Sequence, residues 1–368
     1  MMPPRFAIEV HLTEQPTPPR VRSNVLSSTL GFGQVFTEHM VEIPYREGDG
    51  WLPGALKPYA RIELDPAAAV LHYGQSVFEG FKAFRQLDGG IASFRPEANA
   101  KRFQLSARRL AMPEMPIDMF IEAADLLIQN DRDWVPSLRG TSLYLRPLLI
   151  ATERCLGVRP SREYSFVLIG SPAGNYFHGG VKPVNVWVCD NYVRAAPGGT
   201  GEAKFGGNYA ASLIAQAEAT ERGCAQVVWL DAVNRTHVEE MGGMNIFFVY
   251  QSNGRTTLVT PKLSGSLLPG ITRDSLLLIG PMLGYSVEER TISFDEWSSA
   301  ATAGHMTEAF ACGTAAVITP IGTVCRQHGE FMMGDGQGGP VSQKLRESLL
   351  SIQYGEAPDT LGWMHRVC

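Results

Sequence analysis

Short apolar runs alternate along the chain with segments whose apolar positions recur every three or four residues. The runs "YSFVLI" (164–169), "VNVWVCD" (184–190) and "AQVVWLD" (225–231) have the length and β-branched content of buried strands. We also expect strands at "VLHY" (70–73) and "SLYLRP" (142–147). The helical spacing in "NAKRFQLSARRLA" (99–111) and "IDMFIEAADLLIQN" (117–130) predicts two amphipathic helices.

The second half is richer in predicted strands. "NIFFVY" and "TTLVTP" flank "QSNGR", in which Asn253-Gly254 predicts a hairpin turn. Further strands are expected at "SVEERTI" and "AAVITP", and a helix at "ITRDSLLLIGPML". We predict another helix over "NYAASLIAQAEATER" (208–222), with Asn208 near its start and Gly223 as its stop signal. The pattern therefore predicts a mixed α/β (α+β) fold.

A Gly- and Pro-rich stretch, "GSPAGNYFHGGVKP" (170–183), separates two predicted strands. We place a domain boundary there. The predicted division is an N-terminal extension (1–30), a small N-terminal domain (31–170), an interdomain loop (171–183) and a large C-terminal domain (184–368).

Composition narrows the class of protein. Hydrophobic residues make up 44% of the 368 residues, charged residues 19%, and the net charge is −5, so nucleic acid is not an expected partner. The six cysteines form no CxxC pair and have no histidine at zinc-ligand spacing, so we expect reduced thiols and no metal site. Without a signal peptide or an apolar run of about 20 residues, we expect a cytoplasmic protein and no membrane partner.

Two glycine-rich strings resemble nucleotide-binding motifs in part, but each lacks a feature that the motif requires. "GDGQGG" (334–339) fits GxGxxG, but Pro340 follows it near the end of the chain, so we expect an exposed loop. In "GTGEAKFGGNY" (199–209), Phe205 follows Lys204 where a P-loop has Ser or Thr. HExxH and GxSxG are absent from the sequence.

The residues around Lys204 leave two possible roles for its side chain. It could be a solvated surface charge, or an amine that forms a Schiff base in a pocket with glycine walls. Tyr209, five residues later, could supply a phenol near the amine. The string "VEEMGGMNIFFV" offers Glu239 and Glu240, which are either a pair facing water or one inward carboxylate for a protonated ring nitrogen.

Two further turns could bind an anion. In "LLPGITRDSLL" the N–H groups of Ile271 and Thr272 open a helix and are suited to phosphate, although the turn could equally be an ordinary Pro-Gly turn with a threonine cap. "ACGTAAVITP" places Thr314 and Ala315 in a turn that could meet an anion or be buried.

In this order, these strings resemble the branched-chain amino acid aminotransferases, pyridoxal-phosphate enzymes of fold type IV, and the actinobacterial members in particular. The resemblance runs from "GFGQVFTEHM" (31–40) to "GWMHRV" (362–367) and includes "HYGQSVFEGFKAFR". It implies a smaller N-terminal α/β domain and a larger, strand-rich C-terminal pseudo-barrel domain, with the cofactor at their interface. It also implies a homodimer.

The resemblance assigns roles to individual residues. Lys204 would be the catalytic Schiff-base lysine, Tyr209 would hydrogen-bond the cofactor's phenolic oxygen, and Glu240 would pair with the pyridine nitrogen, which leaves Glu239 as a bystander. The cofactor phosphate would be bound by Arg102, Ile271, Thr272 and Thr314. The substrate would be bound by Phe32, Tyr73, Phe78, Tyr144, Arg146, Leu156, Val158, Tyr176, Gly243, Thr314 and Ala315, of which Tyr73, Leu156 and Val158 would reach the neighbouring subunit's site.

The implied reaction is ping-pong transfer of an amino group between Leu, Ile or Val and 2-oxoglutarate. An aromatic and aliphatic pocket suits the branched side chains, while Arg146 with Tyr73 and Tyr144 would receive the side-chain carboxylate of glutamate. Within the same fold, a D-amino acid aminotransferase or an aminodeoxychorismate lyase is the alternative. Those chains are usually shorter and lack the "GFGQVFTEHM" segment.

Overall fold

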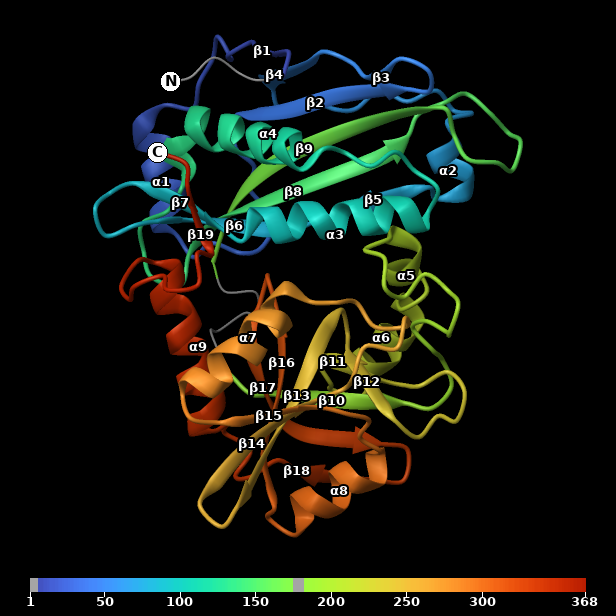
Figure 1. Ribbon diagram of the computed structural model, residues 1–368, viewed down its shortest axis with the longest axis vertical. Helices are drawn as coiled ribbons and strands as arrows, with labels where there is room; N and C mark the ends of the chain where they lie inside the picture. The colour runs from blue at the N-terminus through green and yellow to red at the C-terminus, as the bar shows by residue number, and fades with distance from the viewer. Residues whose placement is uncertain (1–5, 175–181) are drawn as a thin grey trace. The chain divides into compact units, whose positions relative to one another are not determined.

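A computed structural model describes residues 6–174 and 182–368 of the chain (Figure 1). The chain forms two compact units. Unit 1 comprises Met1–His178, Ala203–Gly206 and Ile352–Cys368, and unit 2 comprises Gly179–Glu202 and Gly207–Ser351. The chain therefore returns to unit 1 for the four residues that contain Lys204, and again at its C-terminus.

Unit 1 is built on a mostly antiparallel sheet with the order β1-β4-β2-β9-β8-β6-β7-β19, in which β3 also pairs with β2 and β5 with β8. Its strands are β1 (Ile8–Val10), β2 (His39–Arg46), β3 (Gly50–Trp51), β4 (Gly54–Pro58), β5 (Ser76–Phe78), β6 (Phe81–Arg85), β7 (Ile91–Phe94), β8 (Ser142–Ala151), β9 (Glu163–Ala173) and β19 (Met364–Arg366). Its helices are α1 (Pro19–Ser27), α2 (Ala69–Tyr73), α3 (Pro96–Arg109), α4 (Ile117–Asn130) and the 3₁₀ turn η1 (Arg132–Trp134).

Helices α3 and α4 cover one face of this sheet (Figure 1). Pro96 in the first turn of α3 and the arginines in its last turn suit a helix start and end. The apolar faces of both helices meet the sheet through Phe103, Phe120 and Phe166, whose ring centroids lie 5.5 to 6.1 Å apart. All three rings are fully buried. The two predicted amphipathic helices are confirmed.

The predicted strand at "VLHY" (70–73) is wrong, because these residues form α2. A run of four residues is too short to distinguish a period of two from one of 3.6. The turn closes where Gly74 adopts a left-handed conformation and its N–H donates to the Val70 carbonyl.

Unit 2 contains a second sheet with the order β12-β11-β10-β17-β16-β13-β14-β15, and β12 also pairs with β13. Its strands are β10 (Val184–Cys189), β11 (Gln226–Leu230), β12 (Val238–Met241), β13 (Met244–Ser252), β14 (Arg255–Thr260), β15 (Ser286–Glu289), β16 (Met306–Gly313), β17 (Val317–Arg326) and β18 (Gly329–Met332). Its helices are α5 (Gly206–Ala210), α6 (Leu213–Glu221), α7 (Ile271–Met282), α8 (Phe294–Thr302) and α9 (Pro340–Gln353), the first beginning and the last ending within unit 1. The β12–β13 pairing closes the sheet into the expected barrel-like ring.

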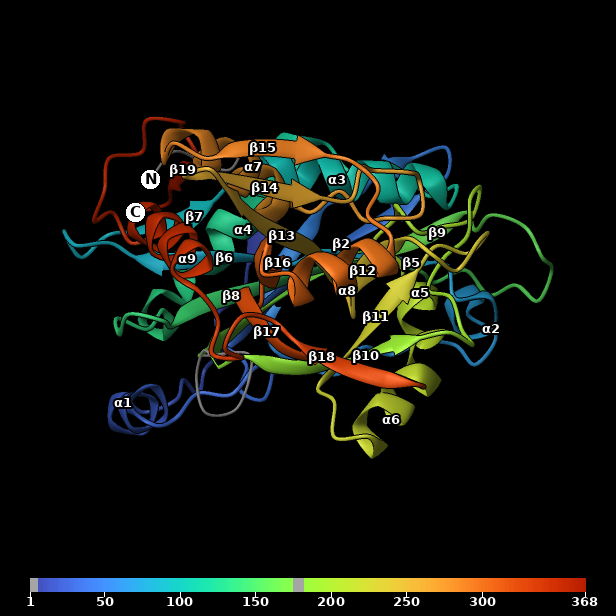
Figure 2. The ribbon, with the colours of Figure 1, turned by 90° about the horizontal axis from the view of Figure 1, so that it is seen from below.

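The predicted helix over 208–222 is interrupted. It forms as α5 and α6, which are separated at residues 211–212. Ser212 donates both its N–H (3.0 Å) and its hydroxyl (2.6 Å) to the Tyr209 carbonyl, so a local turn takes the acceptor that a continuing helix would use. After the break, α6 lies beside β10 and β11 (Figure 2). Its buried residues Ala215 and Ala219 pack in the same cluster as Cys189 of β10 and Trp229 of β11.

The glycine-rich string 334–339 forms a loop, as expected, but the chain then continues as α9. The Glu308 carboxylate accepts hydrogen bonds from the N–H groups of Val341 (2.9 Å) and Ser342 (2.8 Å). A Cβ on Gly339 would lie 2.0 Å from that carboxylate, so the glycine allows the contact. A protein carboxylate thus occupies the helix start that a dinucleotide phosphate would need.

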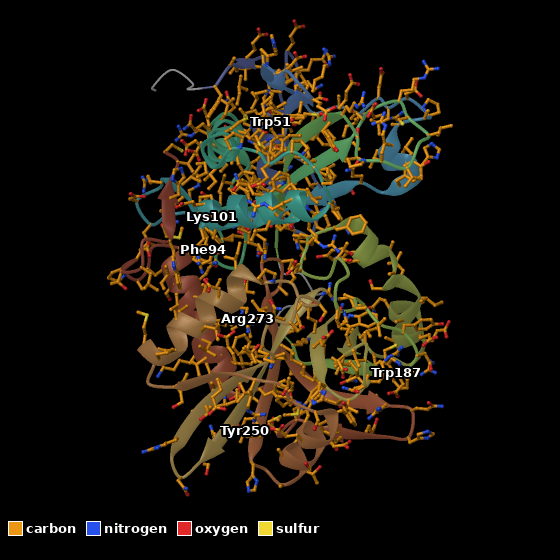
Figure 3. All side chains as sticks on the ribbon, turned by 45° about the vertical axis from the view of Figure 1, so that its right-hand side comes forward. Trp51, Phe94, Lys101, Trp187, Tyr250 and Arg273 are labelled. Atoms are coloured by element: carbon orange, nitrogen blue, oxygen red, sulfur yellow. The ribbon has the colours of Figure 1, made fainter. Side chains whose placement is uncertain are left out.

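The remaining predicted elements of unit 2 are confirmed. Asn253 and Gly254, with φ of 49° and 73°, form the turn between β13 and β14. Helix α7 includes Arg273 (Figure 3). This arginine is buried and donates to the Pro261 carbonyl at 2.9 Å and to Glu289 at 2.6 Å. Among the described helices, none has both the length and the apolar character needed to cross a bilayer.

Candidate active site

Lys204 is held in unit 1 through its backbone. Its N–H donates to the Ser106 hydroxyl of α3 at 2.9 Å, and its carbonyl accepts from the N–H of Phe78 at 3.0 Å. The neighbouring Phe205 forms an antiparallel bridge with Val77. The half-buried lysine places its Nζ 5.0 Å from the centre of the Phe78 ring. The amine thus lies beside an aromatic residue that the sequence analysis assigns to the substrate pocket.

Arg102 lies on the buried face of α3 and forms a two-bond fork with Glu79. Its Nε donates to Oε1 at 2.7 Å, and its Nη2 donates to Oε2 at 2.9 Å. The Glu79 side chain has no exposed surface, and that of Arg102 is 7% exposed. Glu79 is a feature of this site that the sequence analysis did not identify.

Four residues predicted to bind substrate lie together in unit 1. The rings of Phe32 and Tyr144 meet edge to face with centroids 4.8 Å apart. Arg146 donates to the Tyr144 hydroxyl at 3.0 Å and lies 4.9 Å from the centre of the Phe78 ring. The group therefore combines three aromatic rings with one guanidinium, whose buried Nε has no hydrogen-bond partner among the described groups.

Gly80 makes room for this group. A Cβ at Gly80 would lie 1.8 Å from the Tyr144 hydroxyl oxygen, so any larger residue would displace the tyrosine. On the same sheet, Arg146 also borders a cavity of about 430 Å³ whose lining is mainly apolar. The other lining residues are Met40, Tyr59, Ala60, Arg61, Ile62, Leu148, Val167 and Ile169.

Tyr73, Leu156 and Val158 form a separate, exposed group in unit 1. The Tyr73 hydroxyl donates to the Leu156 carbonyl, which ties the end of α2 to the segment after β8. The Leu156 side chain is 64% exposed and that of Val158 is 86% exposed. Two apolar residues this exposed are available for a partner. Their contact with a neighbouring subunit stays a prediction.

Glu240 is the buried member of the carboxylate pair in unit 2, at 2% exposure. Its Oε1 accepts from the N–H of Leu268 at 2.8 Å and from the Asn245 amide at 3.2 Å, while Oε2 pairs with Nε of Arg194 at 2.7 Å. Glu239 has different surroundings. Burial raises the pKa of its carboxyl above the ordinary value, and Ser266 donates to it at 2.5 Å.

Arg194 is a site residue that the sequence analysis missed. Besides binding Glu240, its Nη2 donates to the carbonyls of Gly201, at 3.1 Å, and Ser266. It therefore joins Glu240 to the glycine-rich segment before Lys204 and to the segment before the Pro-Gly turn. An arginine in "YVRAAPGG" has no spacing or motif that would indicate this role.

The phosphate turn predicted at the start of α7 is joined to Glu240. Asn245 donates to the Leu268 carbonyl at 3.0 Å as well as to Glu240. A Cβ on Gly270 would lie 2.0 Å from the Asn245 side-chain oxygen, so glycine is required where the chain enters the helix. The helix then begins at Ile271, followed by Thr272, as predicted.

The other predicted residues of unit 2 lie in α5 and in two turns. Tyr209 is in α5, and a Cβ on Gly243 would lie 3.1 Å from its ring. Thr314 and Ala315 lie in the turn between β16 and β17 and are partly exposed. Asn208 bonds to Thr200 through both ends of its amide. Tyr176 lies outside the described residues.

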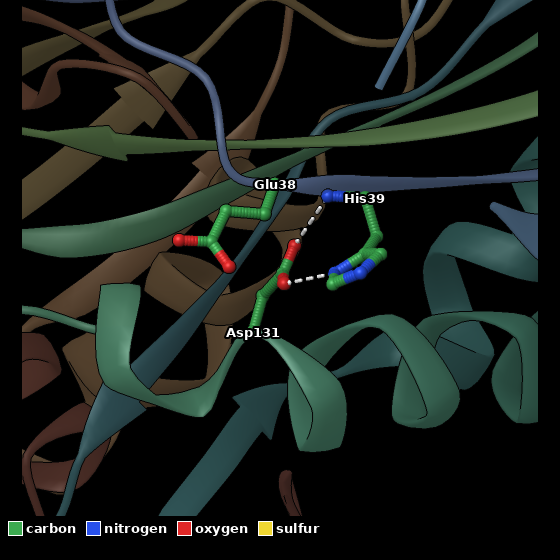
Figure 4. A group of neighbouring side chains, drawn as sticks. All are labelled: Glu38, His39 and Asp131. Carbon is green, nitrogen blue, oxygen red and sulfur yellow. Dashed lines mark hydrogen bonds and ion pairs between the residues drawn. The ribbon is translucent and has the colours of Figure 1, made fainter. Parts of the chain in front are cut away.

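A cluster of Glu38, His39 and Asp131 in unit 1 has metal-ligand chemistry (Figure 4). However, Nδ1 of His39 bonds to Asp131 at 2.6 Å, and Nε2 accepts the N–H of Thr13 at 3.0 Å. Nε2 thus attaches the N-terminal segment to β2, and Nδ1 attaches β2 to the end of α4, so both ring nitrogens are engaged. We interpret the cluster as structural.

The chain is similar to known aminotransferases over nearly its whole length. The family described as "Amino-transferase class IV" matches residues 76–324. A branched-chain-amino-acid aminotransferase of Mycolicibacterium smegmatis is 59% identical over 359 residues, which cover 97% of both chains. The solved structure of the Escherichia coli branched-chain amino acid aminotransferase has a TM-score of 0.73 at 27% identity and covers 90% of this chain and 100% of that chain.

A second solved structure carries the cofactor. The branched-chain amino acid aminotransferase from Thermobaculum terrenum, in its PLP-form, has a TM-score of 0.71 at 25% identity, covering 91% of this chain and 100% of that chain. Class IV aminotransferases use pyridoxal 5'-phosphate. This chain therefore belongs to the class IV aminotransferases and, within them, to the branched-chain-amino-acid aminotransferases.

Proposed function

We propose that this enzyme transfers the amino group of Leu, Ile or Val to 2-oxoglutarate, using pyridoxal 5'-phosphate. The grouping of Phe32, Phe78, Tyr144 and Arg146 carries the proposal. Three aromatic rings offer an apolar surface to a branched side chain. The adjacent guanidinium can bind the second carboxylate of glutamate or 2-oxoglutarate, which would be costly to bury unpaired.

The described residues fit the chemistry of the cofactor. A buried carboxylate at Glu240 suits a protonated pyridine nitrogen, and the start of α7, with N–H groups of Ile271 and Thr272, suits a phosphate. When bound, pyridoxal phosphate supplies an electron-accepting ring that stabilises negative charge at the substrate Cα. We assign Arg102 and Thr314 to the phosphate and Tyr209 to the phenolic oxygen.

Lys204 is the catalytic residue in this proposal. Its Nζ would hold the cofactor through a covalent bond and, as a free amine, would take up the proton from the substrate Cα. The two bonds on its backbone hold the Cα of the lysine in place while the side chain moves. We assign the N–H groups of Thr314 and Ala315 to the α-carboxylate of the substrate, and Gly243 to substrate binding. Tyr176 stays a predicted substrate residue.

We also propose that the enzyme is a cytoplasmic homodimer. The exposure of Leu156 and Val158 supports the dimer, because apolar side chains at 64% and 86% exposure are more stable against a partner. In the proposed dimer these residues and Tyr73 complete the neighbouring subunit's pocket.

A coupled assay tests the proposed function. Leu, Ile, Val, Phe and D-Ala are each supplied with 2-oxoglutarate, and glutamate formation is measured. We expect turnover of the three branched L-amino acids and none of D-Ala. Turnover of D-Ala alone would replace the proposal with a D-amino acid aminotransferase. Persistent leucine turnover by Lys204→Ala would contradict the role of the lysine.

A further inference from the structure

Glu79 has no role in the reaction as proposed so far, yet it is a fully buried carboxylate beside the pocket residues of unit 1. Its side chain has no exposed surface and accepts three hydrogen bonds. Two come from Arg102, and the third comes from the N–H of Gly80 at 3.0 Å. Its own N–H donates to the Pro147 carbonyl at 2.8 Å, so both the backbone and the side chain are fixed.

The same two elements hold Lys204. Ser106 follows Arg102 by one helical turn on the buried face of α3 and accepts the N–H of Lys204. Phe78, which precedes Glu79, donates its N–H to the carbonyl of Lys204. Phe78 and Ser106 thus hold the backbone of Lys204, while Glu79, next to Phe78, holds the side chain of Arg102. The lysine backbone and the arginine side chain are therefore fixed by neighbouring residues.

We propose that Glu79 is a positioning residue for phosphate recognition and acts by orienting the guanidinium of Arg102. This inference rests on the proposed function, in which Arg102 binds the cofactor phosphate. A guanidinium has five N–H donors in one plane, so a two-bond fork to Glu79 fixes that plane without exhausting its donors. An arginine held this way loses less side-chain freedom when phosphate binds.

A purely structural role would give a different result. If Glu79 only neutralised a buried charge, its replacement would lower stability without distinguishing ligands that carry a phosphate from those that do not. If it orients Arg102, its replacement weakens only the contact that Arg102 makes. Pyridoxal has the ring and aldehyde of the cofactor and lacks the phosphate, so it separates the two roles.

The experiment titrates the full-length chain, freed of cofactor, with pyridoxal 5'-phosphate and with pyridoxal. For Glu79→Gln we expect about 3- to 10-fold weaker binding of pyridoxal phosphate, because binding must then order one more flexible side chain, that of Arg102. Binding of pyridoxal should be unchanged. Glu79→Asp keeps the charge on a shorter arm and should show a smaller loss with the same selectivity. If the Gln variant does not fold, the Asp variant decides the test.

Two controls complete the experiment. Asp131→Asn removes another buried, paired carboxylate of unit 1 and should lower the melting temperature without changing the ratio of the two affinities. In an Arg102→Gln background, Glu79→Gln should have no further effect on pyridoxal phosphate binding. Equal losses for both ligands, no loss, or tighter binding would overturn the inference while leaving the function intact. A wild-type chain that binds neither ligand would instead overturn the proposed function.

Discussion

At the scale of single residues, two adjacent glutamates have sharply different surroundings. Glu240 is fixed by Arg194, Asn245 and the Leu268 N–H, whereas Glu239 bonds to a serine. Of the two, Glu240 is the carboxylate that is paired with a guanidinium at a buried position. The contrast favours Glu240 over Glu239 for the proposed contact with the ring nitrogen.

We expect Glu240→Gln to lower kcat about 100-fold or more, because a neutral amide cannot stabilise a charged pyridine nitrogen. Glu239→Gln should retain kcat near the wild-type value. Steady-state kinetics with leucine and 2-oxoglutarate would measure both variants. Equal losses in the two variants would remove the distinction between the carboxylates.

Arg194 should be important for stability, since its removal leaves the Glu240 carboxylate without its cation at a buried position. We expect Arg194→Gln to lower the free energy of unfolding of the cofactor-free chain by about 3 kcal/mol. Adding Glu240→Gln should recover much of that loss, because the unpaired charge disappears. Urea unfolding of both variants measures the effect, and an equal loss in the double variant would refute the coupling.

The sequence identifies the residues of this site that belong to motifs and misses those that support them. Lys204, Glu240 and the "PGIT" turn could be located because glycines and resemblance mark them. Arg194 and Glu79 could not, because an ion pair between positions 194 and 240, or 79 and 102, exists only once the strands and helices are placed. Local patterns contain no information on such pairs.

At the scale of elements, the turn before α7 depends on one glycine. In Gly270→Ala the new Cβ would meet the Asn245 oxygen at 2.0 Å, so Asn245 must leave its positions on Glu240 and Leu268. We expect weaker binding of pyridoxal phosphate and a lower melting temperature. Gly304→Ala, at a φ of 74° with open space around it, is the matched control. It should cost about 1 kcal/mol of stability and leave cofactor affinity unchanged.

The loop between β11 and β12 should make stability depend on acid pH. Burial raises the pKa of Asp231, but the N–H groups of Asn234, His237 and Thr236 outweigh it and lower the pKa to about 2. Because the folded pKa is depressed, the stabilisation is fully present above the unfolded value of about 3.9 and is lost as the pH falls through about 2.

The change Asp231→Asn measures this stabilisation. The variant should unfold at lower urea concentration than the wild type at pH 6, and the difference should shrink between about pH 4 and pH 2. A difference that stays constant over this range would show that the loop does not owe its stability to the ionised carboxylate.

Secondary structure was predictable where one apolar period extends over many residues, as in α4, whose bounds match the predicted 117–130. The prediction of secondary structure failed where a single local hydrogen bond decides whether a helix continues. The Ser212 hydroxyl on the Tyr209 carbonyl breaks a helix that the apolar spacing would continue. The few residues of α2 are too short a run to show any period.

At the scale of the whole molecule, the chain order does not follow the two units. Lys204 belongs to unit 1 although the residues on either side of 203–206 belong to unit 2. The ring of unit 2 closes through β12 and β13, and its central strands are brought together across more than a hundred residues. Neither feature follows from local periodicity, and only the family resemblance indicates the barrel.

The proposed dimer leads to a test of the complete assembly. If Leu156 acts in the neighbouring subunit's pocket and Lys204 in its own, then a hybrid of Lys204→Ala and Leu156→Asp subunits contains one intact site and one with both defects. Each variant alone should have little activity. Subunits mixed, unfolded and refolded together should regain about one quarter of wild-type activity, because half of the dimers are hybrids and each has one intact site of two.

The control for this mixture is Leu213→Asp, since Leu213 is 65% exposed and belongs to α6 of unit 2, which has no part in the proposed contact. That variant should retain activity, which would show that a charge on an exposed leucine is harmless in itself. Recovery in the mixture requires both a dimer and a contribution of Leu156 across it. Full activity of Leu156→Asp alone, or a mixture no more active than its components, would place the whole substrate pocket within one chain.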